Sequence, residues 1–294
     1  MTDQAINVRA VRARRTWQEN TRRLLKSAPW SARFGMVVIL IYALAAIFAP
    51  LIAPYGEAEV TGAAFAPWSS ANWLGTDQIG RDMFSRVIYG ARNTIGIALV
   101  TVLFSFIIGG SLGVFAAIRG GWLDQILSRV VDALMSIPTL IFALMLLAVF
   151  GKYIVNLIFI LAVLDATRVF RLARNTAMNV VVMDYVEAAK LRGEKVGWIT
   201  FREIVPNILP PLIAEFGLRF CFVFLTISAL SFLGVGIQPP TADWGSMVAE
   251  NKTFITYGKA TPLIPAAAIA LLTVAVNFVV DWFLHKTSGL RDEQ

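Results

Sequence analysis

The chain has 294 residues, of which 57% are hydrophobic and only 15% are charged, whereas about 25% of the residues in soluble proteins carry a charge. A single cysteine, Cys221, and a single histidine, His285, exclude an intrachain disulfide, a cysteine-based metal cluster and a histidine-rich metal site. The formal net charge is +7, but the basic residues gather between apolar segments, which argues against a nucleic-acid-binding protein and predicts a membrane protein.

Six apolar segments follow one another along the chain. A transmembrane helix needs about 20 residues to cross about 30 Å of hydrocarbon. Five segments meet this length, and the fourth is shorter and ends near Asp165 and Arg168. We therefore predict an all-α integral membrane protein with six transmembrane helices. The segments are residues 34–56, 93–118, 133–151, 153–164 (continuing toward 170), 208–233 and 260–280.

Lysine and arginine residues are unevenly divided between the two sides that six spans create. The tail 1–33 alone carries eight of them, and one side holds 19 against six on the other. Because positively charged loops stay in the cytoplasm, we predict that both termini are cytoplasmic. The predicted regions are a basic tail at 1–33, an uncleaved transmembrane anchor at 34–56, an external loop at 57–92, a five-helix core at 93–286 with a cytoplasmic loop at 184–206, and a short tail at 287–294.

The external loop at 57–92 contains a pattern typical of a surface helix. Thr76 or Asp77 is expected to cap its N-terminus. Apolar residues then recur at helical spacing, which predicts an amphipathic helix on the outer membrane interface. In the external loop before the last span, Trp244 is expected in the aromatic belt of the membrane. The apolar face of the predicted helix carries Met83, Phe84, Val87 and Ile88.

A polar stretch at residues 184–211 interrupts the apolar segments and is rich in charge. Helix-forming residues around Ala188 and Ala189 come first, and Gly193 follows them, where it permits a sharp turn. A second helical run then leads to prolines that begin at Pro206 and suit the first turn of a helix. We predict two short helices on the cytoplasmic membrane surface, where another protein can bind. An ordinary surface hairpin is the simpler alternative.

Three segments resemble signatures of one protein family. Glu187-Ala188-Ala189, Gly193 and Pro206 are similar to the EAA loop of permease subunits in binding-protein-dependent ABC importers. Residues 74–92 match the pattern LGTDxxGRDxxSRxxYGAR, and residues 231–247 resemble SFLGLGxQPPxxxWGxM, with valine in place of the second leucine. These two patterns resemble the second permease subunit of dipeptide, oligopeptide and nickel importers.

The resemblance implies a type I ABC importer permease fold in the bacterial inner membrane. It also implies a heterodimer with a second homologous permease subunit, two ATP-binding subunits and a periplasmic or lipid-anchored substrate-binding protein. Short peptides are the expected cargo, while nickel chelates, glutathione and opine- or sugar-like solutes remain open. The residues expected to couple the permease to its ATPases are Glu187, Ala188, Ala189, Gly193 and Pro206.

Charged residues inside the predicted spans usually mark function. Glu215 and Arg219 are four residues apart in the acid-first order, which predicts an ion pair within the membrane. A self-contained secondary transporter driven through such acidic residues is the alternative function, although no internal repeat is visible. Spacing of three residues predicts the same local pairing for Asp132 with Arg129 and for Asp165 with Arg168.

The chain lacks the residues of several other functions. No GxxxxGK[ST] loop occurs, so we do not expect this subunit to hydrolyse ATP. The glycine run at 108–113 is predicted to be a helix break or a close helix contact rather than a nucleotide site. One histidine near the end of the chain leaves no plausible Ser/His/Asp set. We therefore expect no enzyme activity and no cofactor, with membrane lipids as the remaining partner and no nucleic acid.

Overall fold

The computed structural model describes residues 28–287, and this part of the chain is built from helices with only two isolated β-bridges. The predicted tails therefore lie almost wholly outside the described residues. The elements are α2 (Trp30–Ile47), α3 (Ala49–Ile52), α4 (Met83–Arg119), α5 (Gly121–Met135), α6 (Thr139–Phe150), α7 (Ile154–Val181), α8 (Asp184–Leu191), α9 (Val196–Ile199), the π-helix η1 (Thr200–Ile204), α10 (Val205–Phe232), α11 (Trp244–Asn251), the 3₁₀-helix η2 (Lys252–Tyr257) and α12 (Leu263–Thr287).

Four helical runs in the described part are long and apolar enough to cross a membrane: α2, α4, the run from α9 to α10, and α12. A fifth arises if α5 and α6 are taken as one span with a bend of 88°. The helix α7 is 28 residues long but is not among them, because charged residues such as Arg168 and Arg171 interrupt its apolar character. The fold is therefore that of a multi-helix membrane protein with four to five apolar spans.

The third predicted span, residues 133–151, is broken rather than straight. Helix α5 ends at Met135, α6 begins at Thr139, and Pro138 stands before its first residue. Proline has no N–H to donate, and its ring disfavours the helical conformation of the preceding residue, Ile137. The prediction of one continuous helix was wrong because an apolar run of sufficient length hides a local backbone break.

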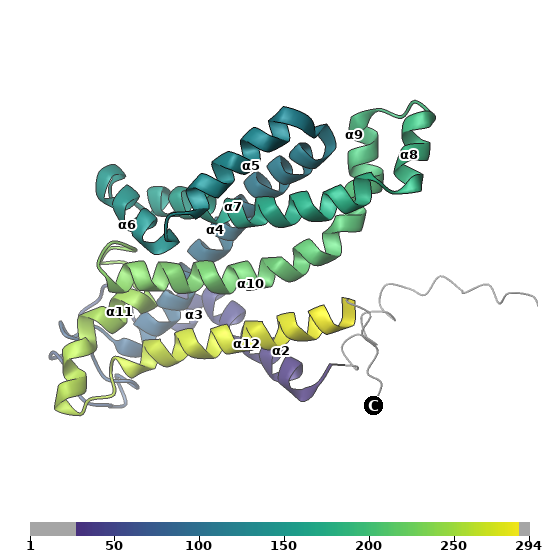
Figure 1. The fold of residues 1–294 in the computed structure, drawn as a ribbon. Helices are drawn as coiled ribbons and strands as arrows, with labels where there is room; N and C mark the ends of the chain where they lie inside the picture. The colour runs from purple at the N-terminus through teal and green to yellow at the C-terminus, as the bar shows by residue number, and fades with distance from the viewer. Residues whose placement is uncertain (1–27, 288–294) are drawn as a thin grey trace, which may run out of the picture.

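The long helices lie side by side in one bundle, and the short helices gather at its two ends (Figure 1). Helices α8 and α9 extend beyond one end, where α2 begins and α12 finishes. The opposite end holds α6 and α11. The charged segment 184–206 thus lies at the same end of the bundle as the start of α2 and the end of α12.

The most extensive helix contact in the described part of the bundle joins α4 to α7. A Cβ added to Gly109 would lie 2.3 Å from the carbonyl oxygen of Ala166, and one added to Gly113 would lie 2.6 Å from that of Phe170. Only glycine lets the two backbones approach so closely. The predicted role of the glycine run as a helix contact is thereby confirmed for these two positions.

The first external segment differs from the predicted surface helix. Met83 opens the long helix α4, so the expected amphipathic helix is the first part of a span. The cap is Asp82, whose carboxylate accepts a hydrogen bond from the Ser85 N–H at 2.8 Å, and not Thr76 or Asp77. Met83 is fully buried, because the apolar face packs against the protein itself and not against lipid.

Candidate functional site

The short helix α8 is seated on the ends of the long helices by one narrow face. Val186 and Ala189, three residues apart, are fully buried. They join a small apolar core that includes Ala177 of α7 and Ile204 and Ile208 from the start of the next long helix. The connection from α9 into α10 is continuous through the π-helix η1, so α8 and α9 are tied mechanically to both α7 and α10.

The turn between α8 and α9 depends on Gly193. Its φ angle is +78°, a conformation that residues with a Cβ rarely adopt. The Gly193 N–H donates to the Lys190 carbonyl at 3.0 Å, and the Glu194 N–H donates to the Ala189 carbonyl at 3.2 Å. This pair of bonds is a Schellman motif, which ends α8 and satisfies its last carbonyls. The glycine thus has a backbone role in this segment.

The predicted coupling residues separate into an outward and an inward group. Glu187, Ala188, Gly193 and Pro206 are exposed, whereas Ala189 is fully buried beneath α8. Ala189 is therefore not available to touch another protein in this arrangement, and its small side chain instead lets α8 lie close to the bundle. Large apolar side chains that stand out around the segment are Tyr185, Leu191, Val196 and Phe201.

Charged residues near the middle of the bundle form one cluster across three helices. The Nε of Arg219 lies 2.7 Å from Glu215 Oε1, and its Nη1 lies 3.6 Å from Asp165 Oδ1. Asp165 also accepts a hydrogen bond from the Ser105 hydroxyl at 3.0 Å. The structure thus contains the Glu215–Arg219 ion pair and adds Asp165 to it. Arg219 joins α7 to α10, and Asp165 joins α4 to α7 through Ser105.

The two other local ion pairs predicted from three-residue spacing are not the pairs that form. Asp132 pairs with Arg171 of α7, at 2.5 Å, rather than with Arg129, and Asp165 pairs with Arg219 rather than with Arg168. Spacing along one helix gave the wrong partners because neighbouring helices offer closer ones. A further pair, Asp124 with Arg174, also joins α5 to α7.

A buried charge network at the α11 end links the pattern at residues 74–92 to Glu250, which lies three residues after the pattern at 231–247. Arg81 Nε lies 2.6 Å from Asp77 Oδ2, and Arg81 Nη2 lies 2.9 Å from Glu250 Oε2. Arg86 lies 3.4 Å from both carboxylates. Asp77, Arg81 and Arg86 are at most 4% exposed. In the sequence, this contact was indicated only by opposite charges: arginines in the pattern at 74–92 and an acidic residue, Glu250, after the second pattern.

Trp244 belongs to the core and not to the aromatic belt. It is 1% exposed, and its Nε1–H donates to the Val87 carbonyl at 2.9 Å. Its ring makes edge-on contacts with Tyr42 and Phe224. A Cβ on Gly90 would lie 2.6 Å from that ring. The prediction for Trp244 was wrong because local hydropathy cannot distinguish a tryptophan at the membrane interface from one that packs between segments far apart in the sequence.

Asp243, next to Trp244, is buried and caps α11. Its carboxylate accepts hydrogen bonds from the Ser246 N–H at 2.8 Å and from the Thr94 hydroxyl at 2.9 Å. Burial raises the pKa of the Asp243 carboxyl, and these hydrogen bonds partly offset the rise. The capping bonds fix α11 against α4 at the same end of the bundle as the Arg81 network.

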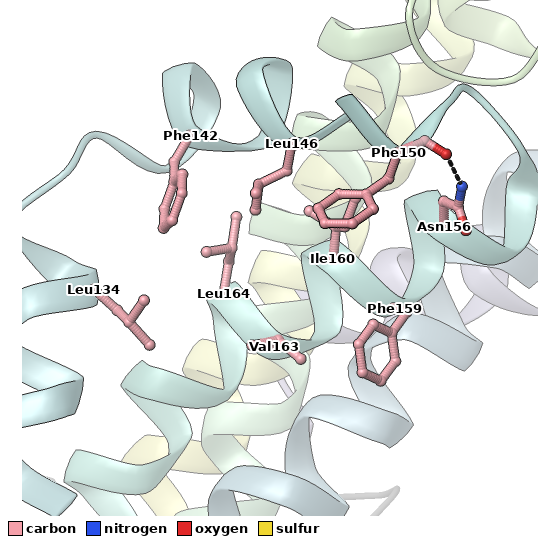
Figure 2. A pocket seen from close by; sticks show the side chains of 9 residues that line it. All are labelled: Leu134, Phe142, Leu146, Phe150, Asn156, Phe159, Ile160, Val163 and Leu164. Atoms are coloured by element: carbon pink, nitrogen blue, oxygen red, sulfur yellow. Dashed lines mark hydrogen bonds between the residues drawn. The ribbon is translucent and has the colours of Figure 1, made fainter. Parts of the chain in front are cut away.

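An apolar cavity of about 370 Å³ lies at the bend between α5 and α6, where both face α7. Figure 2 shows Phe142, Leu146 and Phe150 of α6 on one side of it and Ile160 and Leu164 of α7 on the other. The Asn156 amide donates to the Phe150 carbonyl at 2.6 Å and closes one end. Among residues 28–287, no group of three or more His, Cys, Asp or Glu side chains could hold a metal ion.

The helical bundle, its internal ion pairs and the projecting helices α8 and α9 are typical of a membrane transport subunit. Residues 109–286 match the family described as the inner membrane component of binding-protein-dependent transport systems. Residues 16–67 match the N-terminal transmembrane domain of oligopeptide transport permease C. The chain belongs to the family of binding-protein-dependent transport permeases and is a multi-pass inner membrane protein.

Three curated relatives span nearly the same length. The dipeptide transport system permease protein of Alkalihalophilus pseudofirmus is 34% identical, over 94% of this chain and 88% of the relative. The glutathione transport system permease protein of Pectobacterium atrosepticum is 32% identical, over 97% and 92%. The probable D,D-dipeptide transport system permease protein of Escherichia coli is 34% identical, over 92% and 88%.

A solved structure gives independent support for the fold. The chain is similar to one from an inward-facing conformation of the MetNI methionine ABC transporter, with a TM-score of 0.57 and 19% identity. The match covers 69% of this chain and 97% of that one. At this level of identity the likeness concerns the fold alone, which is that of an ABC importer permease.

Proposed function

We propose that this chain is one of two different permease subunits in an ATP-driven importer of short peptides. The observation that carries the proposal is the exposed segment α8–α9 at one end of the bundle, which has the residue pattern of an ATPase-coupling loop and a continuous connection into α10. Relatives named for dipeptides and for glutathione, itself a tripeptide, support the cargo class.

In the proposed topology six spans cross the membrane: α2, α4, the bent α5–α6 pair, α7, α10 and α12. Both termini then lie in the cytoplasm on the side of α8 and α9, in agreement with the excess of lysine and arginine there. One of the two ATPase subunits binds the exposed surface around Glu187, Ala188 and Gly193, and the other binds the corresponding loop of the second permease subunit. A substrate-binding protein delivers cargo at the opposite end, near α11.

The proposed mechanism is alternating access driven from α8. Closure of the two ATPases on ATP displaces the helix, and Val186 and Ala189, which anchor it to the ends of α7 and α10, transmit the movement. The charge cluster of Asp165, Glu215 and Arg219 lies between these same helices. The subunit itself has no phosphate-binding loop, so hydrolysis takes place on its partners.

The test is peptide uptake by the reconstituted importer. The chain is co-purified with its second permease and ATPases, placed in proteoliposomes, and supplied with the binding protein, ATP and a radiolabelled dipeptide. Accumulation that requires both ATP and the binding protein supports the proposal. Accumulation driven by a proton gradient without ATP supports the secondary transporter instead. No transport of dipeptide, with ATP-dependent transport of a nickel chelate or a sugar, overturns the cargo class.

A further inference from the structure

The half of α7 that leads to α8 carries a polar stripe on one exposed face. Arg168, Arg171, Asn175 and Asn179 recur at intervals of three, four and four residues, which places them on one side of a helix, and all four are exposed. On the opposite side, Val169, Phe170, Ala173 and Ala177 are buried. Met178 is an exposed apolar side chain at the edge of this face. The other exposed residues of this half of α7 are hydrophilic, the reverse of what lipid contact requires.

A helix in a membrane bundle does not turn two arginines and two asparagines toward lipid, because charged and amide groups lose their hydration there. The stripe must face either water or another protein. Contacts between transmembrane helices are typically made by small and apolar residues, whereas water-filled paths are lined by polar ones. The composition of the stripe thus favours a water-filled path over a subunit contact.

The inner end of the stripe opens on a small hollow of about 60 Å³ between α6, α7 and α10. Its lining includes Asp165, Arg168 and Arg219, together with Thr139 and Thr226. The hollow has the space of about two water molecules, or of one carboxylate group. Arg168 is the residue that belongs both to the hollow and to the stripe.

The cations of this hollow are incompletely paired. Arg219 is 8% exposed, and its Nε and Nη1 have carboxylates nearby but no hydrogen bond of acceptable geometry. Among the described residues, no carboxylate oxygen lies within 4.0 Å of the Arg168 guanidinium, so Arg168 forms no ion pair there. Arg219 is shared between Asp165 and Glu215, so Arg168 is the guanidinium of the hollow that is left to bind an anion. Arginine binds carboxylates through two parallel hydrogen bonds.

We propose that the stripe of Arg168, Arg171, Asn175 and Asn179 lines the translocation path, and that Arg168, with Arg219 behind it, binds the carboxylate of passing cargo. This inference rests on the proposed function, since a peptide with a free C-terminus supplies that carboxylate. It assigns the pore-facing side of α7 and makes Arg168 a specificity-determining residue.

The first test is the reactivity of single cysteines in the assembled importer, in inside-out vesicles. Cys221, which is buried, is replaced by alanine, and Asn175→Cys or Asn179→Cys is introduced. Ile107→Cys, at an apolar position of α4 that is 63% exposed, is the control. Membrane-impermeant thiosulfonates should modify the α7 cysteines at least ten times faster than the control. Absence of modification at both α7 positions in every nucleotide state means that the stripe is buried against a partner subunit, and overturns the proposal.

The second test measures the charge of the path. An anionic thiosulfonate should react with Asn175→Cys faster than a cationic one, and Arg168→Gln should lower that rate ratio several-fold. Arg168→Lys should largely keep it. If Arg168→Gln leaves this rate ratio unchanged, the charge of Arg168 does not act on reagents in the path, and the assignment of Arg168 to the path is overturned.

The third test concerns cargo. Arg168→Gln should reduce ATP-driven uptake of a dipeptide with a free carboxylate several-fold in the same vesicles, while Arg168→Lys restores most of it. Equal uptake by the glutamine variant overturns the carboxylate site. Failure of the proposed function can be told apart from failure of this inference. If the proposed function is wrong, wild-type vesicles take up no peptide, but the cysteine reactivity needs no cargo and still tests whether the stripe lines a path.

Discussion

The Gly193 turn offers a prediction whose sign and size follow from backbone geometry. A residue with a Cβ at a φ of +78° adopts the left-handed conformation, which costs about 1–2 kcal/mol. No heavy atom lies within 4 Å of the position of that Cβ, so the cost is confined to the backbone. Such a penalty lowers the equilibrium ratio of molecules with the α8–α9 turn to molecules without it by a factor of about 5–30.

Gly197 provides the matched control in the same segment. Its added Cβ also has open space around it, its φ is not in the left-handed range, and it lies within α9. Alanine in a helix is favoured over glycine by about 1 kcal/mol. Gly193→Ala should therefore weaken binding of the ATPase subunits, Gly197→Ala should leave it unchanged or strengthen it, and Gly193→Asn should lie near wild type because asparagine tolerates this conformation.

The assay is titration of the purified permease pair with its ATPase subunits, with ATP hydrolysis as a second measurement. Thermal unfolding of the permease reports whether the spans are intact, and they should be, because the turn lies outside the bundle. Equal loss of ATPase binding in Gly193→Ala and Gly197→Ala would refute the reasoning, since the segment would then be sensitive to any added methyl group. So would an asparagine variant as defective as the alanine one.

Two further predictions concern stability in detergent. Arg219→Met should lower the free energy of unfolding by about 3–5 kcal/mol, because it strands both Asp165 and Glu215; Glu215→Gln should cost less, since Arg219 keeps Asp165. Thermal unfolding of the two variants measures the difference, and equal losses would mean that the three side chains are not coupled. Trp244→Ala should cost about 3–5 kcal/mol, whereas Trp68→Ala, at a side chain that is 72% exposed, should stay within about 0.5 kcal/mol in the same assay.

Local patterns in the sequence predicted the α8–α9 segment well. The helix-forming alanines, the glycine and the following prolines act over one or two turns of backbone, and each has its own conformational preference. The structure contains two short helices there, with Gly193 at the turn. The burial of Ala189 was not predictable from the triplet alone, because it depends on where α7 and α10 end.

A local backbone break and long-range contacts account for the predictions that were wrong. Hydropathy treats residues 133–151 as one span, although Pro138 breaks it. Spacing along one helix gave Asp132 the partner Arg129, although Arg171 on another helix lies closer. Trp244 occupies the core because a distant glycine, Gly90, leaves space for its ring. The partner of Asp132 and the burial of Trp244 depend on which helices become neighbours, which a single sequence does not display. The break at Pro138 is instead local to the backbone.

The central claim is that this permease works with separate ATPases through α8 and α9. The most direct measurement is mass spectrometry of the proteins that co-purify with the tagged chain from native membranes in mild detergent, compared with the Gly193→Pro variant, whose fixed φ is incompatible with the turn. We predict that wild type co-purifies with two ATPase subunits and a second permease. We predict that the variant keeps the second permease and loses only the ATPases. Recovery of wild type alone or as a homodimer, with no ATPase at any salt concentration, would contradict the account.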